Sequence, residues 1–157
     1  HEAKEAGLDE VTCWGDGSPL REFLYVDDLA NLCVFLMNNY SGNETVNAGT
    51  GKELTIKALT ELVAKVVGFT GEIKWDTSRP NGTPRKLLDV SKATALGWSY
   101  QTELEDGIRL AYDDSCIIPC VEKGNDLKHY LCKFFYYPEA LGNVFGLYQI
   151  TVVPNSL

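Results

Sequence analysis

The sequence predicts an α/β fold, because amphipathic helical segments alternate with short β-rich runs up to about residue 115 of its 157 residues. A hydrophobic share of 45% and a charged share of 23% are ordinary for one globular domain. No apolar run approaches the roughly 20 residues that a membrane-spanning helix needs, so we expect a cytoplasmic protein. The formal net charge of −8 argues against nucleic acid as a partner, because such binding uses a basic face.

The first β-rich run covers Val11 to Trp14 and ends in a Gly-Asp-Gly-Ser-Pro turn. A second run, Phe23 to Val26, follows the turn, which predicts a strand, a tight loop and a strand. Asp27 or Asp28 then supplies an expected cap for a helix. The apolar stripe of this helix consists of Leu29, Leu32, Cys33 and Leu36.

A short strand is expected from Thr45 to Asn47, leading into the turn Gly49-Thr50-Gly51. Thr55 is the expected N-cap of a second helix, and Gly68 is its expected end. The predicted buried stripe of that helix is Ile56, Leu59, Val63 and Val66.

The next expected strand runs from Glu72 to Trp75, and a short helix is expected from Ser91 to Gly97-Trp98. Thr102 and Glu105 have the spacing of a capping box for a last helix. Its apolar residues are Leu104, Ile108, Leu110 and Ala111.

The loop Gly82 to Asp89 contains two adjacent cations, Arg85 and Lys86, ahead of an apolar run. Pro84 restricts the backbone before them, so both side chains leave the turn in a limited range of directions. Arg and Lys are the residues that bind phosphate oxygens. This pattern favours a diphosphate site, and the ordinary alternative is a solvated basic surface.

Trp14 and Arg21 flank the Gly-Asp-Gly-Ser-Pro turn. A flat aromatic ring and a forked cation on one rim can stack on a base or sugar and bind a phosphate. The alternative is a core Trp beside a surface Arg.

Four segments, WGDGSPLREFLYVDDLA, NAGTG, GTPRKLLDVSKA and LGW, resemble in this order the carboxy-terminal half of the GDP-L-fucose synthase family. That family is a branch of the extended short-chain dehydrogenases/reductases. The pattern REF-x-x-V-x-D-x-A and the LGW segment are shared by many sugar-nucleotide epimerases and reductases, whereas WGDGSPLREF with GTPRKLLD is specific to the fucose synthase branch. The resemblance runs from His1 to about Asp114.

The resemblance implies the substrate-binding part of an NAD(P)-binding Rossmann-type fold. It places Trp14, Arg21 and Lys86 at a GDP-sugar, with Arg21 and Lys86 near the diphosphate. The implied enzyme converts GDP-4-dehydro-6-deoxy-D-mannose to GDP-L-fucose by 3,5-epimerisation and NADPH-dependent 4-reduction, and forms a homodimer. Two alternatives remain: another nucleotide-sugar epimerase or dehydratase, and a non-catalytic binding module.

The family's cofactor-binding and catalytic motifs are not found in this sequence. Its Gly-rich string, Asn47 to Gly51, lacks the G-x-G-x-x-G spacing, and neither Tyr25 nor Tyr40 has a Lys four residues later. Because the chain also begins at His1 without a Met, we expect a fragment. NADP would be bound by an amino-terminal half outside it, and the chain alone would be inactive.

Residues 115–157 form a segment to which the resemblance does not extend, so we divide the chain at Asp114. Cys116, Cys120, His129 and Cys132 are possible zinc ligands, but their spacing fits no common zinc motif and we predict no metal site. A strand from Val144 to Val153 is expected, with no evident place in the family fold.

Overall fold

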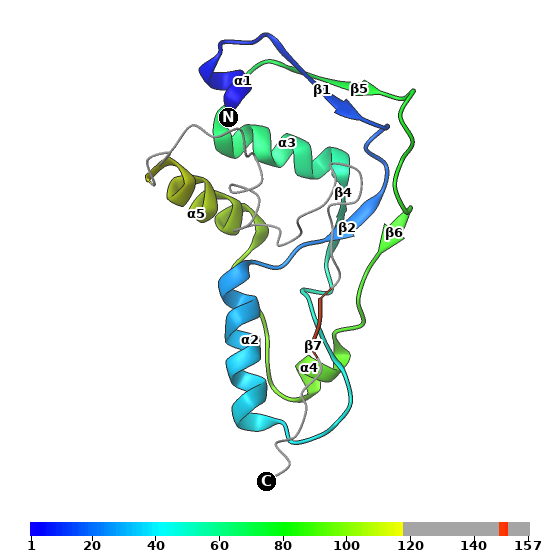
Figure 1. The fold of residues 1–157 in the computed structure, drawn as a ribbon, viewed down its shortest axis with the longest axis vertical. Helices are drawn as coiled ribbons and strands as arrows, with labels where there is room; N and C mark the ends of the chain where they lie inside the picture. Colours follow the sequence, from blue (N-terminus) through cyan, green and yellow to red (C-terminus); the bar gives the residue numbers. More distant parts are fainter. Residues whose placement is uncertain (118–147, 151–157) are drawn as a thin grey trace, which may run out of the picture.

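The computed structural model describes residues 1–117 and 148–150. The chain has an α/β architecture in which helices alternate with short strands (Figure 1). After α1 (Glu2–Glu5), strand β1 (Glu10–Trp14) pairs in parallel with β5 (Glu72–Asp76). The register joins Trp14 to Asp76, so the carboxyl ends of β1 and β5 lie together.

A second sheet has the strand order β4-β2-β6. Its central strand β2 (Leu20–Glu22) pairs antiparallel with β4 (Glu53–Thr55) and parallel with β6 (Arg85–Lys86). A strand does follow the turn after β1, but it lies at Leu20–Glu22, ahead of the predicted run Phe23 to Val26. β1 and β2 belong to different sheets. The loop between β1 and β2 contacts the segment after β5 instead of closing a hairpin.

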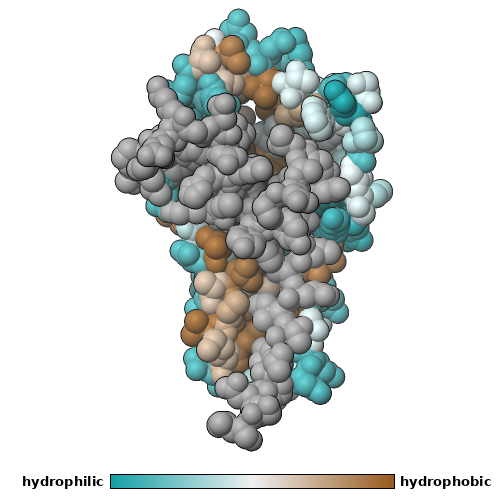
Figure 2. All heavy atoms as spheres, viewed as in Figure 1, coloured by the Kyte–Doolittle hydropathy of each residue, from teal (hydrophilic) through white to brown (hydrophobic). Residues whose placement is uncertain are grey.

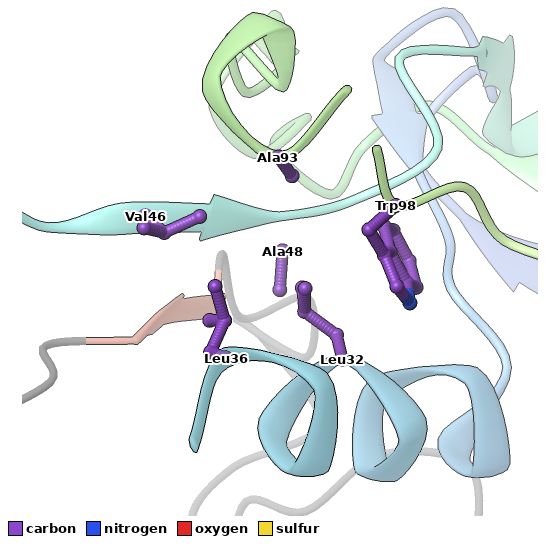
Figure 3. Close-up of a cluster of buried hydrophobic side chains, with 6 residues drawn as sticks. All are labelled: Leu32, Leu36, Val46, Ala48, Ala93 and Trp98. Carbon is purple, nitrogen blue, oxygen red and sulfur yellow. The ribbon is translucent and has the colours of Figure 1, made fainter. Parts of the chain in front are cut away.

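The main hydrophobic core lies where β3 (Val46–Ala48) passes between α2 (Val26–Asn39) and α4 (Ser91–Ala95), as Figure 3 shows. The Trp98 indole packs in the same cluster and donates a hydrogen bond of 2.9 Å to Asn31 Oδ1, which satisfies its polar atom. Leu32, Leu36 and Val46 are fully buried, and a buried side chain of these types contributes about 1.5–3 kcal/mol. The cluster consists of Leu32, Leu36, Val46, Ala48, Ala93 and Trp98.

The predicted limits of α3 (Ile56–Val67) are confirmed. Thr55 accepts a hydrogen bond of 3.1 Å from the Ala58 backbone N–H, and Gly68 ends the helix with φ of 77°. The predicted stripe is partly wrong, because Val67 is buried while Val63 is 38% exposed. α3 packs against α5 (Leu104–Ile117), which shifts the buried face by part of a turn.

Two other capping predictions are wrong. The N-cap of α2 is Tyr25, with no side-chain cap, and Asp28 instead accepts hydrogen bonds from the loop before α5. The capping box of α5 does not form, because the Thr102 backbone N–H bonds to Asp28 and the Glu105 carboxylate pairs with Lys65 and Arg109. In both cases a group that the local pattern assigned to a helix cap is instead bonded to a residue distant in sequence.

Strand β7 (Tyr148–Ile150) pairs antiparallel with β3. The strand expected between Val144 and Val153 is thus confirmed for these three residues, and the expectation that it has no place in the fold is wrong. Of the four possible zinc ligands, Cys116 lies in α5, and Cys120, His129 and Cys132 lie outside the described residues.

Apolar side chains also lie on the outer side of α2, where Figure 2 shows hydrophobic residues gathered over that helix. Val26, Val34 and Met37 are 44%, 57% and 79% exposed. Over residues 1–117 and 148–150, no helix combines the length and the apolar character needed to cross a membrane.

Candidate functional site

The two segments most specific to the resemblance lie side by side, although about 65 residues separate them. The Asp16 backbone N–H donates to Asn81 Oδ1 at 3.0 Å, and the Leu20 N–H donates to the Pro84 carbonyl oxygen at 2.9 Å. Gly17 has φ of 74°, and a Cβ there would lie 2.7 Å from the Trp75 ring, so this close approach requires glycine. The sequence thus folds Trp14–Glu22 and Asn81–Asp89 into one surface.

Arg21 occupies the middle of β2, between Leu54 of β4 and Lys86 of β6. It is only 6% exposed, so the alternative of a surface Arg is wrong. Its Nη1 donates to the Leu20 carbonyl oxygen at 2.6 Å, whereas its buried Nε has no hydrogen-bond partner among the described residues. Burial lowers the pKa of the Arg21 guanidinium, which stays protonated because its ordinary pKa is far above neutrality.

A buried cation with an unpaired donor is costly unless a partner of opposite charge completes it. No carboxylate of the described residues forms an ion pair with Arg21. The geometry therefore favours an anion that is not part of these residues.

Lys86 is the register partner of Arg21 across the parallel pair β2–β6. Residues in register on neighbouring parallel strands project from the same face of a sheet, so the two cations lie on one side. The Lys86 side chain is half-buried, and within the described part of the chain no hydrogen bond or ion pair engages it. Lys86 is thus free to bind a ligand next to Arg21.

Arg85 has a different environment from its neighbour Lys86. Its guanidinium forms an ion pair of 2.8 Å with Glu53 on β4. Successive side chains of a strand point to opposite faces, which separates Arg85 from the side shared by Arg21 and Lys86. An open hollow of about 390 Å³ is lined by Arg85, Leu87, Leu88 and Asp89.

Trp14 ends β1 and is 57% exposed, so the alternative of a core Trp is also wrong. The guanidinium carbon of Arg79 lies 5.1 Å from the centre of its ring, in a cation–π contact. No such contact joins Trp14 to Arg21 or Lys86. The structure therefore places Arg21 and Lys86 opposite each other on neighbouring strands. Trp14 lies at the other end of the loop that joins β1 to β2.

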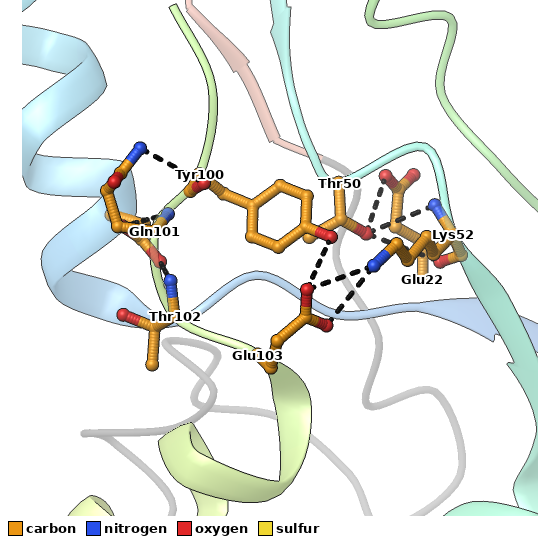
Figure 4. Close-up of polar contacts among 8 residues, drawn as sticks. Glu22, Thr50, Lys52, Tyr100, Gln101, Thr102 and Glu103 are labelled. Carbon is orange, nitrogen blue, oxygen red and sulfur yellow. Dashed lines mark hydrogen bonds and ion pairs between the residues drawn. The ribbon is translucent and has the colours of Figure 1, made fainter.

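Glu22 ties the site to the Gly-rich turn, and this residue was missed by the sequence reasoning about the site. Its carboxylate accepts hydrogen bonds from the Gly51 N–H at 2.5 Å, the Leu88 N–H at 3.0 Å and the Thr50 hydroxyl at 3.4 Å. Figure 4 shows Glu22 beside Thr50, with Lys52, Tyr100 and Glu103 forming a neighbouring polar cluster. The sequence feature that could have identified Glu22 is its position next to Arg21 in the REF-x-x-V-x-D-x-A pattern.

The same contacts test whether the Gly-rich turn fits the pyrophosphate of NADP. A Cβ at Gly49 would lie 2.4 Å from a Glu22 carboxylate oxygen, so this carboxylate fills the space that a dinucleotide phosphate would need. Strand β4, and not a helix, follows the turn. The turn therefore does not fit NADP. Over the described residues, no group of three or more His, Cys, Asp or Glu side chains is arranged to hold a metal ion.

Asp28 is the second residue whose role sequence reasoning missed. It is 5% exposed and accepts hydrogen bonds from the backbone N–H groups of Gln101 at 3.0 Å and Thr102 at 2.9 Å. Asp28 thereby fixes the chain entering α5 against the start of α2, which follows β2 directly. The REF-x-x-V-x-D-x-A pattern thus combines a buried cation with two carboxylates that hold backbone segments around it.

Comparisons with known proteins agree with this arrangement. Residues 1–49 match the model of the NAD dependent epimerase/dehydratase family. GDP-L-fucose synthase 1 of Arabidopsis thaliana is 58% identical over 113 residues, which cover 72% of this chain and 35% of the relative. GDP-L-fucose synthase of Escherichia coli is 41% identical over 121 residues, covering 71% of this chain and 38% of the relative.

A solved structure, the GDP-L-fucose synthetase of Naegleria fowleri bound to NADP, superposes with a TM-score of 0.64 at 29% identity. The superposition covers 69% of this chain and 34% of that one. The chain is similar in residues 1–49 to the NAD dependent epimerase/dehydratase family, and it shares part of the Rossmann-type α/β fold of the superposed structure. It is similar to the GDP-L-fucose synthases, and it spans about a third of the length of the curated relatives it matches.

Proposed function

We propose that this chain binds the nucleotide-sugar of a GDP-L-fucose synthase, with Arg21 and Lys86 at the diphosphate and Trp14 at the base or sugar. The observation that carries the proposal is the pairing of Arg21, buried with an unbonded Nε, and Lys86, which has no partner in the described part of the chain. A diphosphate supplies several anionic oxygens, and it can accept bonds from a guanidinium fork and an ammonium at once.

Binding of this kind contributes to catalysis without supplying a reacting group. Contacts to the diphosphate and to the base hold the distant sugar ring in one orientation, and this lowers the entropic part of the barrier for steps at the ring. Glu22 and Asp28 support the same role, because they fix the backbone segments on either side of β2.

The complete reaction in this proposal converts GDP-4-dehydro-6-deoxy-D-mannose to GDP-L-fucose by epimerisation at C3 and C5 and NADPH-dependent reduction at C4. NADPH would be the hydride donor of the whole enzyme, and no step is assigned to the Gly-rich turn, which the cofactor does not fit. A homodimer and a cytoplasmic location belong to the same proposal. The alternatives of another nucleotide-sugar epimerase and of a binding module are not favoured, because the curated relatives at 41–60% identity are named GDP-L-fucose synthases.

Calorimetric titration of the chain with GDP tests the proposal. Replacing Lys86 by Ala removes one charge-assisted phosphate contact, which costs about 1.5–3 kcal/mol, roughly a 10- to 150-fold loss of affinity. Arg21→Gln should give a loss of the same order, and its circular dichroism spectrum shows whether the buried substitution keeps the fold.

Arg85→Ala is the matched control, because it removes the adjacent cation, which is already paired with Glu53. We expect this variant to keep the affinity of the parent chain within about threefold, since an exposed ion pair contributes little. If Lys86→Ala and Arg85→Ala bind GDP equally well, the diphosphate assignment is wrong.

A further inference from the structure

The exposed indole of Trp14 is held by a chain of contacts that the proposed function does not use. Trp14 lies opposite Asp76 at the carboxyl end of the β1–β5 pair. The Asp76 carboxylate accepts hydrogen bonds from Ser78, at 3.0 Å from its backbone N–H and 2.5 Å from its hydroxyl. The turn after β5 is therefore ordered by Asp76 next to the indole.

Arg79 is bound to this turn at two points. Its backbone N–H donates to the Asp76 carbonyl oxygen at 3.2 Å, and its Nε lies 3.7 Å from Asp76 Oδ2. These contacts direct the guanidinium back over the Trp14 ring, with its central carbon 5.1 Å from the ring centre. The distance and the arrangement are those of a cation–π contact.

A guanidinium on one face of an indole has two consequences for a flat ligand. It restricts the rotation of a side chain that is otherwise 57% exposed, so less conformational entropy remains to be lost when the ring is used for binding. Among the described residues one cation lies over the ring, and the 57% exposure of Trp14 leaves indole surface for a second planar group. The order of such a stack is guanidinium, indole, base.

We propose that Arg79 is a positioning residue for the nucleobase, which acts by holding the Trp14 indole in the orientation that stacks on the base. This inference rests on the proposed function, because it takes a purine nucleoside diphosphate as the ligand. It assigns Arg79 no contact with the diphosphate, whose cations Arg21 and Lys86 lie on the neighbouring sheet.

The test compares two ligands, GDP and inorganic pyrophosphate, on the full chain by calorimetry. Arg79→Gln keeps the length of the side chain and removes its charge, and we expect it to weaken GDP binding by roughly two- to fivefold, the range of an exposed cation–π contact. Pyrophosphate has no base, so its affinity should stay unchanged. Arg79→Lys restores a cation and should bind GDP within a factor of about two of the parent.

A double substitution separates positioning from a general loss of charge. In a Trp14→Ala background, Arg79→Gln should have no further effect on GDP, because the residue acts through the indole. Arg109→Gln on α5, where Arg109 pairs with Glu105, is the charge-matched control and should leave both ligands unaffected.

Each result decides between the two proposals. Equal weakening of GDP and pyrophosphate by Arg79→Gln, or no weakening of GDP, overturns the role of Arg79 and leaves the diphosphate site standing. Additive effects of the Trp14 and Arg79 substitutions also overturn it. Failure of the parent chain to bind either ligand contradicts the proposed function itself, and the inference falls with it.

Discussion

Removing the Asp28 carboxylate should destabilise the chain more than its position in a helix suggests. Asp28 is 5% exposed and accepts two hydrogen bonds, from the backbone N–H groups of Gln101 and Thr102. A hydrogen bond to a charged group contributes about 1.5–3 kcal/mol, and bonds that share one acceptor are not additive, so we expect Asp28→Ala to cost about 3 kcal/mol in the free energy of unfolding. For a chain of this length that is roughly 6–12 °C in Tm.

The measurement is urea-induced unfolding followed by far-ultraviolet circular dichroism, with thermal unfolding as a second readout. Asp28→Asn should cost about half as much, because one oxygen remains as an acceptor while the amide N–H₂ faces a donor. Asp27→Ala is the control, since it removes the exposed carboxylate beside Asp28 in the same turn and leaves these two bonds intact. If the shift for Asp28→Ala is no larger than for Asp27→Ala, the tie between α2 and the start of α5 does not stabilise the fold.

Three further outcomes follow from the described contacts. Thr55→Ala should cost about 1 kcal/mol by removing the N-cap of α3, and Thr55→Ser should restore most of it; equal unfolding midpoints for the Ala variant and the parent would contradict the cap. A variant ending at Asp114 lacks β7, the partner of β3, and should lose about 1–3 kcal/mol in urea unfolding, whereas an unchanged midpoint would show that β7 adds nothing. Because the Glu22 carboxylate fills the Gly-rich turn, titration with NADPH should give no binding to this chain and no oxidation with the keto sugar, and measurable NADPH turnover would be the opposite result.

Local signals predicted the elements whose ends depend on neighbouring residues. Thr55 and Gly68 fix both ends of α3 through contacts within a few positions, so their residue types were sufficient. The strands β1 and β5 were also predicted from their β-rich residues. Their parallel pairing joins residues about 60 positions apart, and neither segment contains a local pattern that indicates this partner. The strand expected at Phe23 to Val26 lies at Leu20–Glu22 instead, where Leu20 and Arg21 pair with β6 about 65 positions further along the chain.

The candidate site was predicted in part. Trp14, Arg21 and Lys86 came from the family resemblance, and the residues themselves left a core Trp and a surface Arg open. The burial of Arg21 arises because β2 is the central strand of its sheet, which no local pattern reveals. Glu22 and Asp28 were read as motif letters or as a helix cap, whereas their partners lie 28 to 74 residues away.

A crystal structure of the chain with GDP tests the central claim most directly. The account predicts diphosphate oxygens within hydrogen-bonding distance of Arg21 Nε and Lys86 Nζ, on the face of β2 and β6 that the two side chains share, with Arg85 still paired to Glu53. A diphosphate bound at the Gly49–Gly51 turn in place of the Glu22 carboxylate, or one that contacts neither Arg21 nor Lys86, would contradict it.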